Sequence, residues 1–360
     1  MTEPSRISAG RAVIRLPSRY GAHARQVLSG AVPPVTPRDA ATVMLLRPAA
    51  GGMQVYMLRR TSSMAFAPGA YVFPGGSVDP RDAEPDVSWA GPGPDVWARV
   101  LDVPEELARA LVCAAVRETF EESGVLLAGP GRSSVVGDTS GEDWEADRSA
   151  LLAGSLSLAR MLRRRDLALR ADLLRPWSRW ITPETEKRRY DTRFFAAALP
   201  AGQRTLDLGG DGDGLGSGAS GPGGAGGGLG LGGAGGQGGA HGLGGAGGLG
   251  GAGGLGGAGG LGGAGGLGGG GDSPAGNAGG SAGEADKAAW TDPATALAAA
   301  GRREIVLMPP TAVTLAELRE CGQVEAALAS RRSVTPLMPE ISVTDDGVWL
   351  RLPAGQEYPL

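Results

Sequence analysis

Three glutamates near the middle of the chain have the spacing of a metal-binding helix face. Glu118, Glu121 and Glu122 stand at positions i, i+3 and i+4, which a helix of 3.6 residues per turn presents on one side. Like charges at this spacing repel each other and destabilise an isolated helix, whereas hard cations such as Mg2+ bind clustered carboxylate oxygens. The spacing therefore predicts a divalent metal site and metal-assisted phosphate chemistry.

The residues around the glutamates resemble a known family motif. The segment RETFEESGV, residues 117–125, is similar to the second half of the Nudix box, REUxEExGU with U an apolar residue, and only Thr119 replaces an aliphatic U. Gly76 resembles the glycine that opens the box. The box has a glutamate where this chain has Asp82, and residues 83–116 intervene before the arginine. The resemblance implies a Nudix domain whose box is interrupted by an insertion.

The resemblance also implies roles for the charged residues of the box. Glu118, Glu121 and Glu122 are expected to bind Mg2+ or Mn2+, and Glu121, Glu122 and Arg117 to be catalytic. Arg117 can reach Glu121 at i+4 and hold its carboxylate in place, a task that suits a bidentate guanidinium.

A second signature lies just before the box. Residues 57–76, MLRRTSSMAFAPGAYVFPGG, are similar to the coenzyme A diphosphatase signature LLTxR[SA]xxxRxxxGxxxFPGG, with Arg60 in register and Ala65 in place of the second arginine. The resemblance implies that Arg60, Gly75 and Gly76 bind the substrate, because glycines let the backbone approach a phosphate without a Cβ. A small nucleotide diphosphate, with coenzyme A or acyl-CoA as the leading class, is the expected partner.

Two alternatives to the coenzyme A activity remain open. An ADP-ribose or nucleotide-sugar pyrophosphatase is favoured by the missing second arginine at Ala65. A Nudix fold that has lost catalysis and binds a nucleotide-derived ligand as a regulator is the alternative of a different class, since fold alone does not determine function.

The general base must be a carboxylate. The chain has two histidines, His23 in an N-terminal segment without sustained periodicity and His241 in a glycine-rich tract, so histidine triads and HExxH zinc chemistry are nearly excluded. The candidates are a box glutamate and Glu284, which precedes Trp290 where Nudix relatives often place an additional acid. The alternative for Glu284 is that it has no catalytic role and is a solvent-exposed charge in the linker.

Composition limits the size of the domain and its partners. Of 360 residues, 65 are glycines, most of them in residues 209–283, so about 250 residues are left to fold as one domain.

Acids and bases are interspersed with a net charge of −4, which gives no basic face for nucleic acid. The sequence has no apolar run long enough for a membrane span, and Cys113 and Cys321 lack metal-site spacing. We expect a cytoplasmic protein, with a homodimer as the candidate assembly.

The expected fold is an α/β Nudix fold, a mixed β-sheet sandwiched between helices, with a long disordered Gly-rich insertion. A GGAGGL repeat in the insertion favours a flexible loop, and a bundle of polyproline-II-like helices is the alternative. The chain is divided into a loose N-terminal arm (1–37), the first part of the Nudix domain (38–208, box at 76–125), the Gly/Ala/Leu insertion (209–283), the C-terminal part of the domain (284–335) and a C-terminal tail (336–360).

Periodicity and turn signals predict the elements that position the box. A helix is expected from about residue 104 to Ser123, ended by Gly124 in a left-handed conformation. Arg189, Asp191 and Arg193 of RRYDTRFF, at 188–195, are expected to form a buried ion pair, and an edge of the substrate site is the alternative. The other expected elements are strands at 42–46, 55–58, 71–73, 125–127, 177–181, 192–199 and 305–308, and helices within 143–174, at 293–300 and at 314–331.

Overall fold

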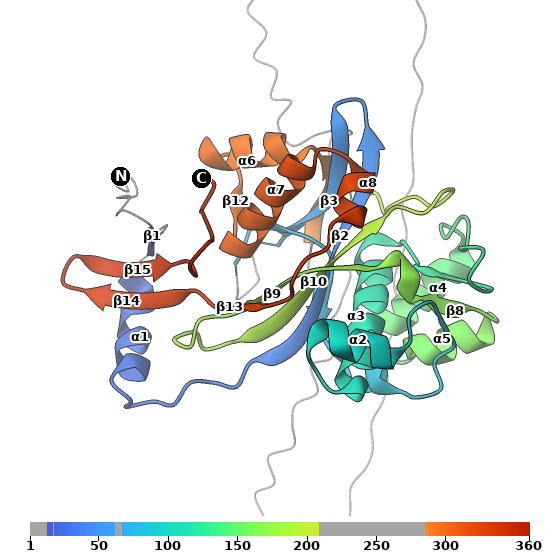
Figure 1. Ribbon diagram of the computed structural model, residues 1–360, viewed down its shortest axis with the longest axis horizontal. Coiled ribbons are helices and arrows are strands. Elements are labelled where there is room, and N and C mark those ends of the chain that lie inside the picture. The colour runs from blue at the N-terminus through green and yellow to red at the C-terminus, as the bar shows by residue number, and fades with distance from the viewer. Residues whose placement is uncertain (1–12, 17, 62–66, 209–284) are drawn as a thin grey trace, which may run out of the picture. The chain divides into compact units, whose positions relative to one another are not determined.

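A mixed nine-stranded sheet forms the centre of the fold, with helices on both faces (Figure 1). The computed structural model describes residues 13–16, 18–61, 67–208 and 285–360. The strands follow the order β12-β4-β3-β2-β10-β9-β13, and β5 pairs with β2 and β11 with β3 off this path. Their bounds are β2 Arg38–Ala49, β3 Gly52–Arg60, β4 Ala70–Val72, β5 Gly75–Ser77, β9 Arg175–Ile181, β10 Tyr190–Ala198, β11 Ala285–Thr291, β12 Val306–Leu307 and β13 Pro336–Leu337.

The described helices fall into two groups that cover opposite faces of this sheet (Figure 1). The group that carries the box comprises α2 (Pro94–Leu101), α3 (Glu105–Ser123), α4 (Glu142–Leu152) and α5 (Leu158–Arg164). The other group comprises α6 (Pro293–Gly301), α7 (Pro309–Cys321) and α8 (Val324–Ala329), and α1 (Gly21–Leu28) lies near the N-terminus.

Alternation along the central strands divides the core into two layers. In β2, Val43 and Leu45 face the layer that contains α3, whereas Met44 and Leu46 face the layer that contains α7. This is the expected result when successive side chains of a strand point to opposite faces of a sheet buried on both sides. The predicted sandwich of a mixed sheet between helices is therefore confirmed.

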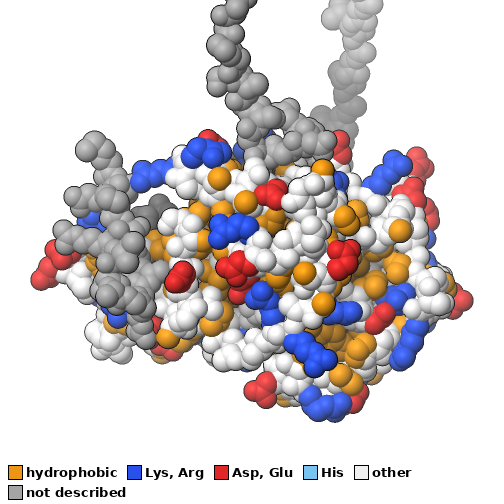
Figure 2. Space-filling view, turned by 45° about the horizontal axis from the view of Figure 1, so that its top comes forward, with side chains coloured by type: hydrophobic (Ala, Val, Ile, Leu, Met, Phe, Trp, Pro, Cys, Tyr) orange, Lys and Arg blue, Asp and Glu red, His pale blue; other side chains and the backbone are white. Residues whose placement is uncertain are grey.

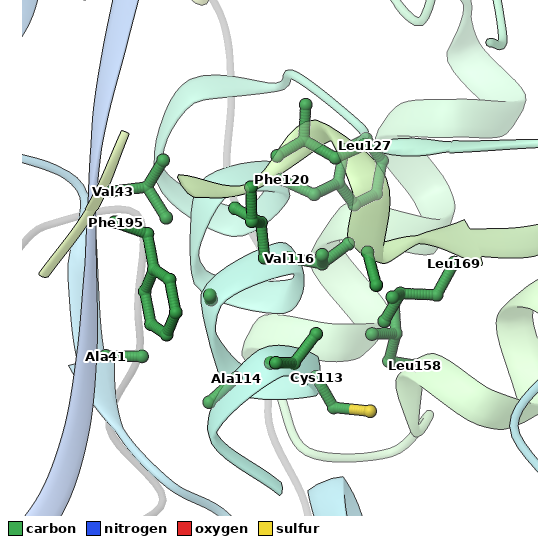
Figure 3. Close-up of a cluster of buried hydrophobic side chains, with 14 of the residues drawn as sticks. Ala41, Val43, Cys113, Ala114, Val116, Phe120, Leu127, Leu158, Leu169 and Phe195 are labelled. Atoms are coloured by element: carbon green, nitrogen blue, oxygen red, sulfur yellow. The ribbon is translucent and has the colours of Figure 1, made fainter. Parts of the chain in front are cut away.

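The parallel pair β2–β10 fixes the middle of the sheet. The two strands pair from Tyr190 opposite Arg38 to Ala198 opposite Leu46. Phe195 of β10 and Val43 of β2 reach toward α3 (Figure 3), where Val116 and Phe120 are fully buried. The box helix is thus packed directly on the centre of the sheet.

Several elements differ from the sequence expectation. Residues 125–127 are buried but are not a strand, because the backbone of Leu126 bonds to the Gln203 side chain instead of a neighbouring strand. The expected helix at 314–331 is two helices, α7 and α8, separated at Gly322, whose φ is 72°. The Gly-rich insertion at 209–283 lies outside the described residues.

Two small sheets were not predicted. One joins β6 (Trp89–Ala90), β8 (Ala168–Arg170) and β7 (Ala128–Gly129), in the order β6-β8-β7. The other joins β1 (Val13–Leu16), β15 (Gly347–Arg351) and β14 (Glu340–Thr344), so segments expected as an arm and a tail pair with each other. Its buried Ile341, Val348 and Leu350 belong to the same core layer as α7.

Among the described residues, none of the helices has both the length and the apolar character that crossing a membrane requires. On the face shown in Figure 2, acidic and basic side chains are interspersed.

Candidate active site

The box helix α3 begins and ends where the sequence predicts. Glu105 and Glu106 lie in its first turn, where carboxylates oppose the positive end of the helix dipole. The helix ends at Ser123, and Gly124 has a left-handed φ of 74°, a conformation that glycine adopts at low cost. The apolar side of the helix is buried, so the opposite side presents the three glutamates to the glycine loop.

Arg117 is the centre of the site. Its guanidinium bonds to both oxygens of Asp82 at 2.9 and 2.8 Å, to Glu118 at 2.8 Å and to Glu121 at 3.1 Å. It also donates to the carbonyl oxygen of Ser77 at 2.9 Å. The predicted contact between Arg117 and Glu121 is therefore present, and one cation holds three carboxylates together.

Asp82 reaches Arg117 through a short turn after the glycine loop. The 3-10 helix η2 (Pro80–Ala83) is capped by Asp79, whose side chain accepts from the Arg81 N–H, while the Asp79 N–H donates to Asp82 at 2.8 Å. These bonds fix the backbone that carries Asp82, which is 3% exposed. Asp82, which stands in the sequence where the box pattern has a glutamate, is thereby held against the Arg117 guanidinium.

The glycine loop fits against the carboxylates because it has no side chains there. The Gly75 N–H donates to Glu122 Oε2 at 2.8 Å. A Cβ on Gly76 would stand 2.4 to 2.6 Å from the carboxylate atoms of Glu118, and one on Gly75 would stand 2.5 Å from the carbonyl oxygen of Ala41. The Gly75 clash is with backbone and excludes any side chain there, whereas a side chain at Gly76 would force the Glu118 carboxylate to move.

Burial disfavours the charged form of the glutamates in the site. Burial raises the pKa of Glu118 to about 7, although Arg117 opposes the shift, and the neighbouring Glu121 adds to it. Burial also raises the pKa of Glu121. Burial lowers the pKa of Arg117, but Glu118 and Asp82 outweigh that effect, so its pKa is raised. A group of carboxylates around one guanidinium favours a further cation.

The donor chemistry fits a hard divalent cation, although the side chains are arranged around Arg117. Within the described ranges, no group of three or more His, Cys, Asp or Glu side chains stands in a metal-binding arrangement. Glu118 and Glu121 face the Arg117 guanidinium, and Glu122 faces the Gly75 N–H. The three glutamates supply only carboxylate oxygens, and Gly76 lies directly against the carboxylate of Glu118.

Arg60 and Glu284 are the two other residues that the sequence predicts for the site. Arg60 is the last residue of β3, and its Cα pairs with that of Ala285 in β11. Its neighbour Arg59 forms an ion pair with Asp286 at 2.7 Å. The candidate base Glu284 lies outside the described residues, as does Ala65.

Two charged residues of RRYDTRFF, Asp191 and Arg193, pair as expected, whereas Arg189 donates to the carbonyl oxygens of Thr182 and Val35. Asp191 bonds to Arg179 at 2.6 Å and lies 3.1 Å from Arg193. Arg193, 1% exposed, also bonds to Asp39 at 2.6 Å. This network links β9, β10 and β2 and is structural.

Sequence reasoning missed the residues that surround the C-terminal end of α3. A pocket of about 180 Å3 opens there between the helix end, α4 and residues 204–207. Arg148 of α4 lines it and donates to the carbonyl oxygen of Glu121 at 2.8 Å. The only local signal was the i, i+3 spacing of Glu145 and Arg148, which is common on solvated helices.

Comparison with known proteins finds relatives that match the part of the chain containing the box helix. Residues 96–207 match the family model described as the NUDT19 Nudix domain. The chain is 32% identical over 199 residues to the human acyl-coenzyme A diphosphatase NUDT19, covering 45% of this chain and 52% of that protein. It is 28% identical over 193 residues to the Xenopus laevis protein of the same name, covering 41% and 48%. The chain thus spans about half the length of these relatives.

A solved structure supports the fold. The crystal structure of a Nudix hydrolase from Alicyclobacillus acidocaldarius aligns with a TM-score of 0.54 at 23% identity, covering 83% of this chain and 98% of that one. Together with the box residues assembled around Arg117, these matches show that the chain has a Nudix fold and is similar to Nudix hydrolases of the acyl-CoA diphosphatase branch.

Proposed function

We propose that the protein hydrolyses the diphosphate linkage of a nucleotide derivative, with coenzyme A or acyl-CoA as the substrate class. The observation that carries this proposal is the cluster of buried carboxylates that Arg117 assembles beside the glycine loop. The similarity to proteins named acyl-coenzyme A diphosphatase supports the choice of substrate.

In this proposal Glu118, Glu121 and Glu122 hold Mg2+ or Mn2+. When bound, such a cation neutralises charge on the diphosphate and lowers the pKa of a water ligand. Arg117 contacts Glu118 and Glu121, so it keeps both carboxylates on one side of the helix, where Gly76 lies against Glu118. Positioning of this kind reduces the reorganisation needed when the substrate binds.

The loop at Gly75 and Gly76 forms the wall against which the diphosphate lies. Its lack of side chains lets the loop backbone lie directly against the carboxylate of Glu118. Arg60, at the end of β3, is proposed to contact the nucleotide or its diphosphate. The proton of the attacking water passes to a carboxylate, for which a box glutamate and Glu284 are the candidates.

The reaction has a simple balance. The water oxygen forms a bond to one phosphorus, and the anhydride P–O bond breaks with its electrons going to the leaving phosphate. Coenzyme A then yields a phosphopantetheine product and adenosine 3',5'-bisphosphate. ADP-ribose or a nucleotide sugar would be cut at the same linkage, and the absence of the second signature arginine at Ala65 favours that second candidate.

The test is product formation from acyl-CoAs, free CoA, ADP-ribose, NADH and nucleotide sugars, with Mg2+ or Mn2+. Glu122→Gln removes one carboxylate of the cluster, and Glu106→Gln is a matched control because Glu106 is exposed on the same helix. CoA turnover that Glu122→Gln abolishes and Glu106→Gln keeps would support the proposal. Preferred turnover of ADP-ribose or sugars would reject the CoA class, and ligand binding without any turnover would support a regulator instead.

A further inference from the structure

We propose that Arg148 is a positioning residue, which holds the last turn of α3 and thereby the carboxylates of Glu121 and Glu122. The inference rests on the proposed function for its effect on catalysis. Its structural part stands on the hydrogen bonds at the end of the box helix.

The last turn of α3 needs partners from outside the helix. The carbonyl oxygens in the final turn of any helix lack intrahelical donors. In a continuing helix the N–H of Val125 would bond to the carbonyl of Glu121, but here it lies 3.2 Å from Ser123 Oγ. Arg148 Nη1 donates to this Glu121 oxygen at 2.8 Å. Arg148 therefore supplies the bond that the helix loses at its end.

The guanidinium of Arg148 is itself held in place. Its Nε and Nη2 atoms donate to the two carboxylate oxygens of Glu145 at 2.8 and 2.6 Å. The Arg148 side chain is 12% exposed, so solvent competes little for its donors. Its positive charge also lies at the negative end of the α3 dipole. A fixed cation at this point stabilises the turn electrostatically as well as by hydrogen bonding.

Other contacts brace the residues that follow this turn. The Leu206 N–H donates to the carbonyl of Ser123 at 2.9 Å, and Thr139 Oγ1 donates to that of Gly124 at 2.7 Å. These bonds fix where the chain leaves the helix. The Arg148 bond acts on the backbone of Glu121 itself, one residue from Glu122.

The position of this backbone determines where the two carboxylates lie. Glu121 reaches Arg117 and Glu122 reaches the Gly75 N–H from the same turn, so rotation of the turn would move both away from the glycine loop. Groups that orient metal ligands from outside the ligand set typically change metal affinity or activity by about 10 to 100-fold when removed. Arg148 is not expected to touch the substrate.

The test compares Arg148→Gln and Arg148→Lys with Arg99→Gln as the control. Lysine can still donate to the Glu121 carbonyl but cannot form the bidentate contact with Glu145. Arg99 is 69% exposed and pairs with Asp95 at 3.1 Å. The measurements are hydrogen exchange of the 121–125 amides without metal, Mn2+ affinity by electron paramagnetic resonance, and kcat and KM with the substrate found for the wild type.

We expect Arg148→Gln to speed exchange in the last turn, to weaken Mn2+ binding about tenfold and to lower kcat more than it raises KM. Arg148→Lys should recover part of each loss, and Arg99→Gln should match the wild type. Unchanged exchange in Arg148→Gln would overturn the inference even if the wild type proved inactive. Changed exchange with Mn2+ affinity and kcat within twofold of the wild type would also overturn it, because the helix end would then not position the glutamates. If Arg148→Gln fails to fold, Arg148→Lys and Glu145→Gln must show faster exchange, weaker Mn2+ binding and lower kcat, each to a smaller extent.

Discussion

Asp82 and Arg117 lie 35 residues apart in sequence and are joined by two hydrogen bonds, of 2.9 and 2.8 Å. Between them the chain forms β6, α2 and most of α3. The guanidinium forms one bond to each Asp82 oxygen, the bidentate geometry that gives charged pairs their specificity. The insertion therefore separates the two halves of the box in sequence but not in space.

Loss of the Asp82 charge should destabilise the protein. Asp82→Asn leaves Arg117 buried with one carboxylate partner fewer, and breaking a buried pair in this way costs about 3 kcal/mol in the free energy of unfolding. Urea denaturation without metal measures the loss. In the control, Asp95→Asn breaks an exposed pair with Arg99 and should cost less than about 1 kcal/mol. Equal effects of the two variants would contradict a central role for the Asp82–Arg117 pair.

A methyl group on the glycine loop should inactivate the site while the fold persists. In Gly76→Ala the new Cβ would meet the Glu118 carboxylate at 2.4 Å and displace it, and a shift of about 1 Å at an active site can lower activity about a hundredfold. Steady-state kinetics together with circular dichroism measure both parts. Gly51→Ala is the control, because no atom lies within 4 Å of its added Cβ. Wild-type activity in Gly76→Ala would show that Glu118 need not stay against the loop.

The stability of the metal-free protein should fall as pH rises toward neutrality. Burial raises the pKa of Glu118 from 4.5 to about 7 in the folded protein, so between these values the folded form holds a proton that the unfolded chain has released. Unfolding is then favoured as pH increases through this window. We expect Glu118→Gln to flatten the fall in Tm between pH 5 and pH 8.

Divalent cations should act in the opposite direction on the same site. Because cation binding requires deprotonated carboxylates, the rise in Tm that Mn2+ produces should be larger at pH 8 than at pH 5. Differential scanning calorimetry at matched ionic strength makes the comparison. A Tm rise that is independent of pH, or present in full in Glu118→Gln, would argue against cation binding at this site.

The segment inserted into the box should contribute to the core. Trp97 of α2 is 4% exposed, and its ring lies 5.8 Å from that of Phe195, edge to face. Trp97→Ala should lower the free energy of unfolding by about 3 to 5 kcal/mol. Val100→Ala on the same helix is the control, because Val100 is 41% exposed, and should change it by less than about 0.5 kcal/mol. Similar denaturation midpoints for both variants would mean that the insertion packs loosely.

Local patterns in the sequence predicted the parts of the site that lie within one helix. The bounds of α3, its termination at Gly124 and the contact from Arg117 to Glu121 all follow from a 3.6-residue period and helix-end chemistry. The central strands β2, β3 and β10 were predicted for a similar reason, since each has a buried apolar run bounded by turn residues.

Contacts between distant segments could not be predicted in the same way. The contact between Asp82 and Arg117 could not be predicted, because no local pattern shows that residues so far apart in sequence lie together in space. Arg148 gave no signal beyond its i, i+3 spacing with Glu145, because its bond to a backbone oxygen depends on where α4 packs. The sheet of β1, β15 and β14 was missed because strands of four or five residues at opposite ends of the chain carry little periodicity.

The parallel pairing of β2 with β10 has a consequence for how the protein is made. Asp39 and Arg193, which bond across it, are 154 positions apart, and such long-range closure is slow compared with local folding. A chain emerging from the ribosome has synthesised Arg117 and all the box glutamates before β10 exists. During that interval β2 lacks its central neighbour and α3 lacks Phe195 beneath it, so the nascent chain exposes an apolar strand edge of the kind that chaperones recognise.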